Sequence, residues 1–392
     1  MKKTILLPVF LILSWTSVVA QPYQTGHRTL FFTDSVRNRV IQTEVYYPAD
    51  SSGENVPVAQ VNNDRFPTVV FGHGFVMSWD AYRNIWDAVV PHGYIVAFPI
   101  TETGFSPQHV ELGKDLAFLT DALQQEGALS NSAFYNRVDS ASCVMGHSMG
   151  GGASFLAVQF NPRITALANL SAAETNPSAV SAAGNIGIPA LLIAGENDCV
   201  TPPAVNQVPM YDSLQSTCKA LVTIHGGSHC QMADNNFFCS IGESSCTPAP
   251  AIARADQHEV INRFLIPWLN FQLKGNCADG LRFDSLATLD TSATTVKNCL
   301  LCTGTSIRIV PEDSGLIFGP NPVNDFLQIN FAKIIPGEVK IFVMDMLGNK
   351  NASKTFSSGQ AYTLDVSALQ MGVYLVGVQT NNKINVFKMV KH

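Results

Sequence analysis

One stretch constrains the fold of this chain more than any other, and it reads Gly146-His147-Ser148-Met149-Gly150-Gly151. It follows a short apolar run, Ser142–Met145, and opens a run rich in glycine and alanine, Met149–Phe160. Glycines on both sides of a serine permit a turn so tight that a side chain at either position would collide with the backbone. The pattern therefore predicts a strand, a sharp turn at Ser148 and a helix, with the serine hydroxyl raised above a sheet.

Around this unit, short β-rich runs alternate with longer helical runs from Arg39 to about Phe271. Such alternation predicts an α/β fold in which a mostly parallel sheet is covered by helices on both faces. The expected strands are Val40–Tyr47, Thr68–Phe71, Tyr94–Pro99, Ser142–Met145, Ala166–Leu170, Ala190–Ala194 and Lys219–His225. The expected helices are Trp79–Val90, Val110–Gln125, Met149–Phe160, Val205–Leu214 and Ile252–Gln272.

A nucleophilic serine needs a base and an acid that orients the base, and on such a sheet both lie on loops after later strands. Asp198 follows one predicted strand and His229 follows the next, so these two residues are the predicted acid and base. Glu196 and His225 are alternatives. His225 still belongs to its strand, however, and Glu196 sits nearer its strand end, where it is expected to support the loop.

The same chemistry needs N–H donors for the oxyanion of the reaction intermediate. Met149 begins the helix after the serine, where backbone N–H groups are free and the helix dipole is positive. The second predicted donor is the N–H of Phe75, in the glycine-containing loop after the strand Thr68–Phe71. The alternative for this loop is a plain turn with a core phenylalanine.

Composition limits what else the chain can be. Its 392 residues are enough for two domains, and a formal net charge of −6 provides no basic surface for nucleic acid. Residues 1–20 combine Lys2 and Lys3 with a short apolar run that ends in small residues. This predicts a signal peptide, cleaved after Ala20, rather than a transmembrane anchor, because the run is too short to span a bilayer.

The composition changes after Gly275. Residues 276–315 carry Cys277, Cys299 and Cys302 without clear periodicity and are predicted to be a linker or an appendage held by disulfides. From Leu316 onward only short strand patterns and turn residues follow, which predicts a small β-sandwich over residues 316–392. The strand patterns there are Phe326–Phe331, Val339–Asp345, Tyr362–Asp365 and Val373–Gln379.

The run from Thr68 to about Gly275 resembles α/β-hydrolases of the cutinase and polyester-hydrolase group, relatives of the dienelactone hydrolases. The resemblance implies an α/β-hydrolase catalytic domain over residues 21–275, a triad of Ser148, Asp198 and His229, and oxyanion donors at Phe75 and Met149. The matching stretches are Gly74-Phe75, Pro91-His92-Gly93-Tyr94, Arg137-Val138-Asp139, Met145–Gly152, Glu196-Asn197-Asp198 and Gly226-Gly227-Ser228-His229.

Two departures concern the substrate. The polyester hydrolases carry a tryptophan after the sixth strand that stacks on aromatic substrates, and Ser171-Ala172-Ala173-Glu174 has none here. This argues against activity on aromatic polyesters. The gap from Leu170 to Pro189 is too short for a cap domain, so an open site suited to bulky or insoluble esters is expected.

The C-terminal 75 residues or so resemble the sorting domain of type IX secretion. The resemblance implies export across the outer membrane, to the medium or the cell surface, with the type IX machinery as a partner. The matching stretches are Gly319-Pro320-Asn321-Pro322, Asp325, Val343–Gly348, Leu364-Asp365-Val366-Ser367, Gly372–Val376 and Phe387–His392.

The expected function is therefore a secreted, monomeric serine carboxylic-ester hydrolase that forms an acyl-enzyme with bulky or polymeric esters, poly(ethylene terephthalate) being one candidate. A lipase or other acyl hydrolase, including a peptidase, is the alternative among enzymes, and a surface adhesin on a retired hydrolase fold is the alternative without activity. No cofactor is expected. No metal site is expected either, because Cys299 and Cys302 form a single C-x-x-C without a second pair.

Nine cysteines are an odd number for an exported chain. Cys143 lies on the strand before the Ser148 turn and is predicted to be a free core thiol. The other eight are expected to form disulfides. Cys199 and Cys230 follow the predicted acid and base, and relatives bridge these two loops from offset positions, so Cys199–Cys218 is equally open. Cys239–Cys246 and Cys277 with Cys299 or Cys302 are the further candidates.

Overall fold

The computed structural model describes residues 23–60, 64–299, 301, 317–319, 321–345, 350–380 and 383–391. The chain divides into two compact units with the boundary between Cys302 and Thr303. The predicted signal peptide lies outside the described residues. Within them, no helix is long and apolar enough to cross a membrane.

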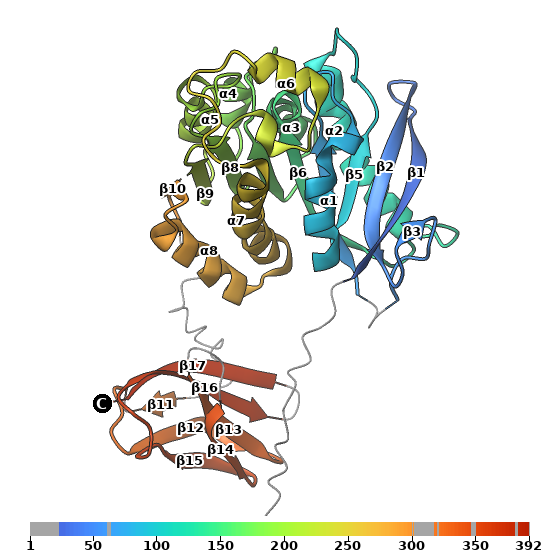
Figure 1. The fold of residues 1–392 in the computed structure, drawn as a ribbon. Coiled ribbons are helices and arrows are strands. Elements are labelled where there is room, and N and C mark those ends of the chain that lie inside the picture. Colours follow the sequence, from blue (N-terminus) through green and yellow to red (C-terminus); the bar gives the residue numbers. More distant parts are fainter. Residues whose placement is uncertain are drawn as a thin grey trace, which may run out of the picture. The chain divides into compact units, whose positions relative to one another are not determined.

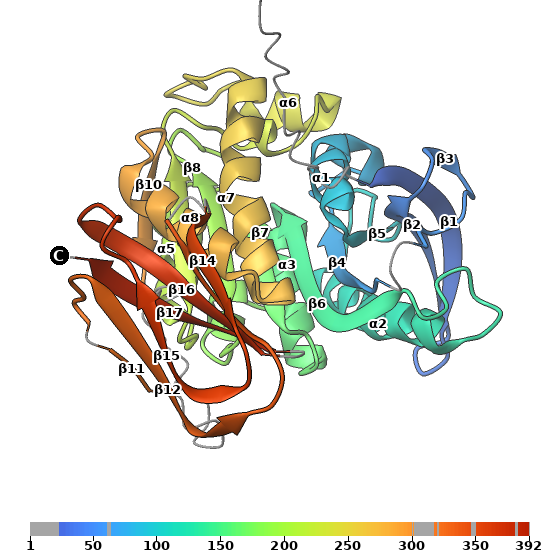
Figure 2. The ribbon, with the colours of Figure 1, turned by 90° about the horizontal axis from the view of Figure 1, so that it is seen from below.

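A ten-stranded sheet forms the centre of the first unit (Figures 1 and 2). Its strand order is β10-β9-β8-β7-β6-β4-β5-β2-β1-β3, and the strands from β9 to β5 in this order are parallel. The remaining pairs are antiparallel except β1 with β3. The strands are β1 (Gln24–Asp34), β2 (Arg39–Ala49), β3 (Gly53–Glu54), β4 (Phe66–Gly72), β5 (Ile95–Pro99), β6 (Val138–His147), β7 (Ala166–Leu170), β8 (Ala190–Gly195), β9 (Lys219–Ile224) and β10 (Ala293–Lys297).

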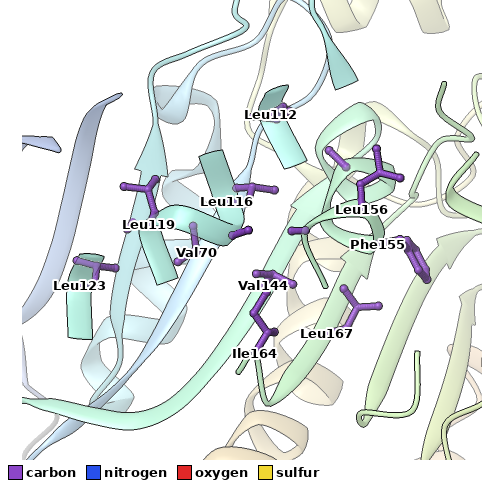
Figure 3. Close-up of a cluster of buried hydrophobic side chains, with 14 of the residues drawn as sticks. Val70, Leu112, Leu116, Leu119, Leu123, Val144, Phe155, Leu156, Ile164 and Leu167 are labelled. Atoms are coloured by element: carbon purple, nitrogen blue, oxygen red, sulfur yellow. The ribbon is translucent and has the colours of Figure 1, made fainter. Parts of the chain in front are cut away.

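Helices cover both faces of this sheet. Successive strand residues point to opposite sides, so each face contributes apolar side chains to its own core cluster. On β4, Val70 packs in one core cluster with α2 and α3, whereas Val69 and Phe71 pack in the other with α1 and α7. Figure 3 shows the first cluster, with leucines of α2 facing the sheet. The helices are α1 (Arg83–Val89), α2 (His109–Ala128), α3 (Met149–Phe160), α4 (Ala179–Ala183), α5 (Gln207–Ser213), α6 (Phe237–Glu243), α7 (Arg254–Lys274) and α8 (Cys277–Leu289).

The linker predicted over residues 276–315 is wrong in its first part. Residues 277–289 form α8, and β10 pairs antiparallel with β9 at the edge of the large sheet. Phe283 of α8 is fully buried against Phe264 of α7, at a ring-centroid distance of 5.8 Å. The sequence signal was weak because only Gly280 and Phe283 of α8 are buried, which leaves no regular apolar stripe.

Two sheets make up the second unit. One has the order β11-β12-β15 and the other β14-β13-β16-β17, and residues from both sheets share one hydrophobic core. This agrees with a small β domain, although the predicted patterns missed β11, β14 and β17. The strands are β11 (Ile317–Gly319), β12 (Phe326–Ile335), β13 (Val339–Met344), β14 (Lys350–Phe356), β15 (Gly359–Asp365), β16 (Gly372–Thr380) and β17 (Lys383–Lys391).

Candidate active site

Ser148 occupies the sharp turn between β6 and α3, as its motif predicted. Its backbone has φ 53° and ψ −121°, a conformation that non-glycine residues seldom adopt. A Cβ atom at Gly146 would lie 2.4 Å from the carbonyl of Gly150, and one at Gly150 would lie 2.1 Å from the oxygen of Gly72. Both glycines are therefore required by close approach of backbone to backbone, and β4 packs directly against the start of α3.

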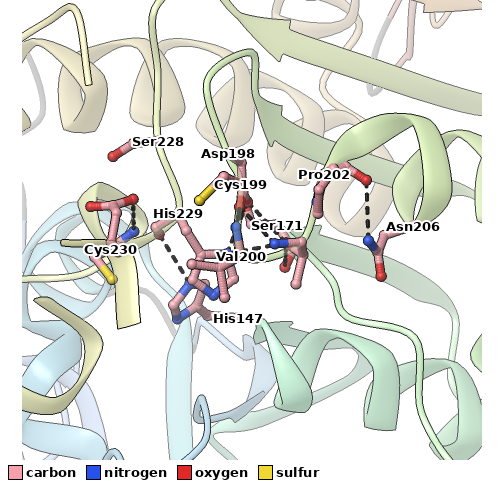
Figure 4. Close-up of polar contacts among 12 residues, drawn as sticks. His147, Ser171, Asp198, Cys199, Val200, Pro202, Asn206, Ser228, His229 and Cys230 are labelled. Atoms are coloured by element: carbon pink, nitrogen blue, oxygen red, sulfur yellow. Dashed lines mark hydrogen bonds and ion pairs between the residues drawn. The ribbon is translucent and has the colours of Figure 1, made fainter. Parts of the chain in front are cut away.

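Asp198 and His229 meet on the loops after β8 and β9. Asp198 Oδ2 and His229 Nδ1 are 2.8 Å apart, and the two side chains are buried (Figure 4). Asp198 Oδ1 accepts from the N–H groups of Val200 and Thr201 at 2.9 and 2.7 Å. A carboxylate that accepts all these hydrogen bonds places the proton on His229 Nδ1 and leaves Nε2 as an acceptor.

Thr201 is a further partner of this pair that sequence reasoning missed. Its Oγ1 donates to Asp198 Oδ2 at 2.9 Å and lies 3.1 Å from His229 Nδ1. The same hydroxyl lies 3.1 Å from the carbonyl oxygen of Ser171, at the end of β7. A threonine three residues after an aspartate is a common local turn partner, and that spacing was the only available signal.

The alternatives weighed for the acid and base lie elsewhere. Glu196 Oε2 accepts from the N–H of Gly226 at 2.9 Å, so this side chain supports the neighbouring loop. The ring nitrogens of His225 contact the Thr291 carbonyl at 3.1 Å and Thr294 Oγ1 at 2.7 Å, on the β10 side. Neither residue lines the cavity that contains Ser148.

Ser148 and His229 line one cavity of about 260 Å³. Phe75, the predicted oxyanion donor, also lines it, and its side chain is 49% exposed. Met149 is the first residue of α3, where its N–H has no partner within the helix. The remaining lining residues are Val76, Met77, Phe105, Val200, Phe238, Cys239, Ile241 and Gly242.

A buried chain of hydrogen bonds connects the three loops of the site. The Gly74 N–H donates to the Tyr82 hydroxyl at 2.7 Å, this hydroxyl lies 3.0 Å from His147 Nδ1, and His147 Nε2 lies 3.2 Å from the His229 carbonyl. Burial, and secondarily the nearby His229, hold the pKa of His147 well below its ordinary value, so the ring is neutral.

The directions of donation in this chain follow from that neutral ring. The His229 carbonyl can only accept, so Nε2 of His147 carries the hydrogen and Nδ1 accepts from Tyr82. Each buried polar group in the chain thereby has a partner. The sequence offered no signal for this contact, because Tyr82 and His147 are 65 positions apart.

Comparison with known proteins places this geometry in a family. Residues 32–245, more than half of the 392-residue chain, match the model described as PET hydrolase-like. The chain belongs to the PET hydrolase-like family. The matched region includes the Ser148 turn, Asp198, His229 and all of α6, and the resemblance stated from the motifs is thereby confirmed. The family implies an α/β-hydrolase fold for the first unit.

The C-terminal resemblance is confirmed as well. Residues 317–392 match the model of the secretion system C-terminal sorting domain, which covers the strands β11 to β17. The second unit of this PET hydrolase-like chain is therefore a sorting domain.

Three curated relatives are about one quarter identical to this chain over the matched residues. The cutinase est2 of Thermobifida alba is 26% identical over 185 residues, which are 47% of this chain and 59% of that protein. Cutinase 1 of Thermobifida cellulosilytica is 25% identical over 187 residues, 47% of this chain and 64% of that protein. A bis(hydroxyethyl) terephthalate hydrolase of Streptomyces coelicolor is 26% identical over 187 residues, which are 47% of this chain and 54% of that protein. This chain thus spans between half and two thirds of the length of these relatives.

None of the disulfides that the structure describes in this PET hydrolase-like chain is among the predicted pairings. Cys199 pairs with Cys246, Cys230 with Cys239, and Cys218 with Cys299. The predicted Cys199–Cys230, Cys199–Cys218, Cys239–Cys246 and Cys277–Cys299 bridges are therefore wrong, and Cys302 lies outside the described residues.

The physical reason is the position of α6. The segment that contains α6 supplies a partner to each loop, Cys239 to Cys230 and Cys246 to Cys199, so the two loops do not pair with each other. Among the described cysteines Cys143 is unpaired and buried, as predicted. Burial raises the pKa of its thiol, which keeps it protonated.

No group of three or more His, Cys, Asp or Glu residues in the described ranges could hold a metal ion.

Proposed function

We propose that this protein is an exported serine ester hydrolase that works through an acyl-enzyme on Ser148. The observation that carries the proposal is the buried Asp198–His229 pair, whose ring shares a cavity with a serine held in a strained turn. Family membership supports the reaction class, and the relatives named cutinase or terephthalate ester hydrolase agree with it.

In the proposed reaction the Ser148 oxygen attacks the ester carbonyl carbon while His229 Nε2 takes the hydroxyl proton. The oxyanion is stabilised by the N–H groups of Met149 and Phe75. As the bond to the alcohol oxygen breaks, His229 returns the proton to the leaving alcohol. Water then attacks the acyl-enzyme with His229 again as base, which releases the acid and restores Ser148. Asp198 orients the His229 ring and stabilises its positive form each time it takes a proton.

Bulky or polymeric esters are the proposed substrates. The cavity walls are largely apolar, and the side chains of Phe75, Phe105 and Ile241 at its edge are exposed, so a large apolar ester can reach Ser148. The sorting domain supports export through the type IX machinery to the medium or cell surface.

The test is the Ser148→Ala variant of the full chain, assayed on p-nitrophenyl acetate. We expect a loss of at least about 10⁴-fold in kcat, because removal of a catalytic serine leaves only the residual effect of binding and the oxyanion donors. Ser140→Ala is the matched control, since this serine is exposed on the same strand. Turnover by Ser148→Ala within tenfold of the native value would disprove the mechanism.

A fluorophosphonate probe separates the enzyme from the adhesin alternative. The probe should label the native chain at Ser148 and leave Ser148→Ala unlabelled, because only a serine with a functional base reacts. An unlabelled native chain would indicate a retired site.

A further inference from the structure

Three phenylalanine rings form a row along the cavity that contains Ser148. The Phe75 and Phe105 rings are 6.4 Å apart and nearly perpendicular, and Phe105 and Phe238 are 5.9 Å apart with an angle of 86°. All three line the cavity. This edge-to-face geometry is the favoured one for aromatic pairs, so the row is a stable arrangement.

The rings of this aromatic row (Phe75, Phe105 and Phe238) are unusually exposed for phenylalanine. Their exposed fractions are 49%, 73% and 49%. Apolar side chains gathered at the mouth of a cavity, rather than scattered singly, indicate a surface that contacts a ligand.

The helix that carries Phe238 is held by crosslinks rather than by a core. None of the seven described residues of α6 is buried. Cys239 in α6 pairs with Cys230, the residue after His229, and Cys246 just beyond it pairs with Cys199, the residue after Asp198. The Cys230 N–H also donates to Glu243 Oε1 at 3.0 Å.

These attachments connect α6 to the catalytic pair in sequence and in space. A helix without buried residues has little packing of its own to fix it. Two disulfides beside Asp198 and His229 supply that constraint and keep Phe238 and Ile241 on the cavity. The arrangement holds an apolar surface at a defined position relative to Ser148.

We propose that α6 and Phe105 determine which acyl groups the enzyme accepts, and that Phe105 and Phe238 contact bulky apolar acyl groups bonded to Ser148. This inference rests on the proposed ester hydrolase function. Phe75 carries the proposed N–H donor to the carbonyl oxygen, and the rings of Phe105 and Phe238 continue from its ring along the same cavity, so we place the acyl group against this row. An acetyl group offers only one methyl group for such contacts.

The experiment compares p-nitrophenyl benzoate with p-nitrophenyl acetate, which share one leaving group. We expect Phe238→Ala to lower the ratio of kcat/KM for benzoate over acetate about tenfold, since an apolar contact is lost only with the larger acyl group. Phe105→Ala should lower the same ratio. Phe238→Leu, which retains most of the apolar volume, should restore part of it.

Phe237→Ala is the matched control. Phe237 is the neighbouring residue on α6, is 74% exposed, and is not among the described residues that line the cavity, although its ring lies 5.6 Å from that of Phe238. Its variant should keep the native ratio within twofold. An unchanged ratio in Phe238→Ala, or an equal loss in Phe237→Ala, would overturn the inference.

The outcome is separable from that of the proposed function. If Ser148→Ala is inactive and Phe238→Ala keeps the native ratio, only the role of α6 fails. If Ser148→Ala retains hydrolysis, the serine mechanism itself fails. Thermal unfolding of each phenylalanine variant should stay within a few degrees of native, because these rings are exposed and the disulfides remain.

Discussion

The proposed nucleophile Ser148 and its two proposed partners are held in place by different means. The Ser148 turn lies at the end of β6, between this strand and α3, and is positioned by backbone atoms in direct contact, with Gly150 against Gly72. The loops of Asp198 and His229 extend beyond the sheet and are each crosslinked to the segment that contains α6. The half with Ser148 therefore depends on steric fit, and the half with Asp198 and His229 has covalent constraint in addition to the close backbone contact of Gly195 with Gly227.

This difference indicates how each half can be disturbed. Backbone contact inside a core tolerates almost no added volume, because the surrounding strands cannot move apart cheaply. A crosslinked loop tolerates surface substitutions but loses its constraint when the crosslink is removed. Three sets of substitutions can test this contrast, in order of decreasing expected effect.

The largest effect is expected for Gly150→Ala. Its Cβ would lie 2.1 Å from the Gly72 oxygen, so β4 or α3 must shift. We expect a stability loss of roughly 5 kcal/mol, near the upper limit for overpacking. A displaced Ser148 should also lower kcat more than about 100-fold. Urea unfolding and p-nitrophenyl acetate kinetics measure both.

Gly187→Ala is the control for this variant, since a Cβ there would meet no atom of the described chain within 4 Å. Its stability should be unchanged or slightly higher. Native activity in Gly150→Ala would show that steric contact is not what positions the nucleophile.

The next effect concerns the crosslinks. Replacing Cys199 and Cys246 by serine opens a loop of 47 residues, whereas replacing Cys230 and Cys239 opens one of 9. The chain-entropy relation predicts losses of about 4 and about 2.5 kcal/mol respectively. Denaturant unfolding of the two double variants measures the order. An equal or reversed order would mean that native contacts of α6, rather than loop closure, dominate.

The smallest effect is expected at the hydrogen bonds that join the loop of Gly74, through Tyr82 and His147, to the loop of His229. Tyr82→Phe removes the hydroxyl between the Gly74 N–H and His147 Nδ1, and both groups remain buried without that partner. We expect a loss of about 2 kcal/mol in the free energy of unfolding, because two buried polar groups lose their partner. We also expect a loss of about tenfold in kcat with little change in KM, because the loops of the site shift while the apolar walls that bind the substrate stay in place.

Tyr94→Phe is the matched control for the hydroxyl loss. Tyr94 is also fully buried, and its hydroxyl donates to Asn270 at 2.7 Å, outside the site cavity. This variant should lose similar stability and keep its kcat. If both variants lose kcat equally, the chain through Tyr82 is structural rather than a positioning contact for the site.

Much of the fold was predictable because its signals are local. Each predicted strand of the first unit overlaps an observed one, and the motif around Ser148 indicated both the turn and the helix that follows. Among the elements that were missed are β1, α8 and β10, since an edge hairpin and a sparsely buried helix carry no strong periodicity.

The sequence by itself indicated the serine turn, because the clash that requires glycine at position 146 is with Gly150, within a few residues of Ser148. The clash that requires glycine at position 150 is with Gly72 and arises only in the tertiary structure. The sequence also favoured Asp198 and His229 through their places after successive strands. Only the tertiary structure decided which cysteines pair, where α6 lies, and that Tyr82 contacts His147. These contacts join residues far apart in the chain, and their geometry depends on how loops extend from the finished sheet, which no local pattern encodes.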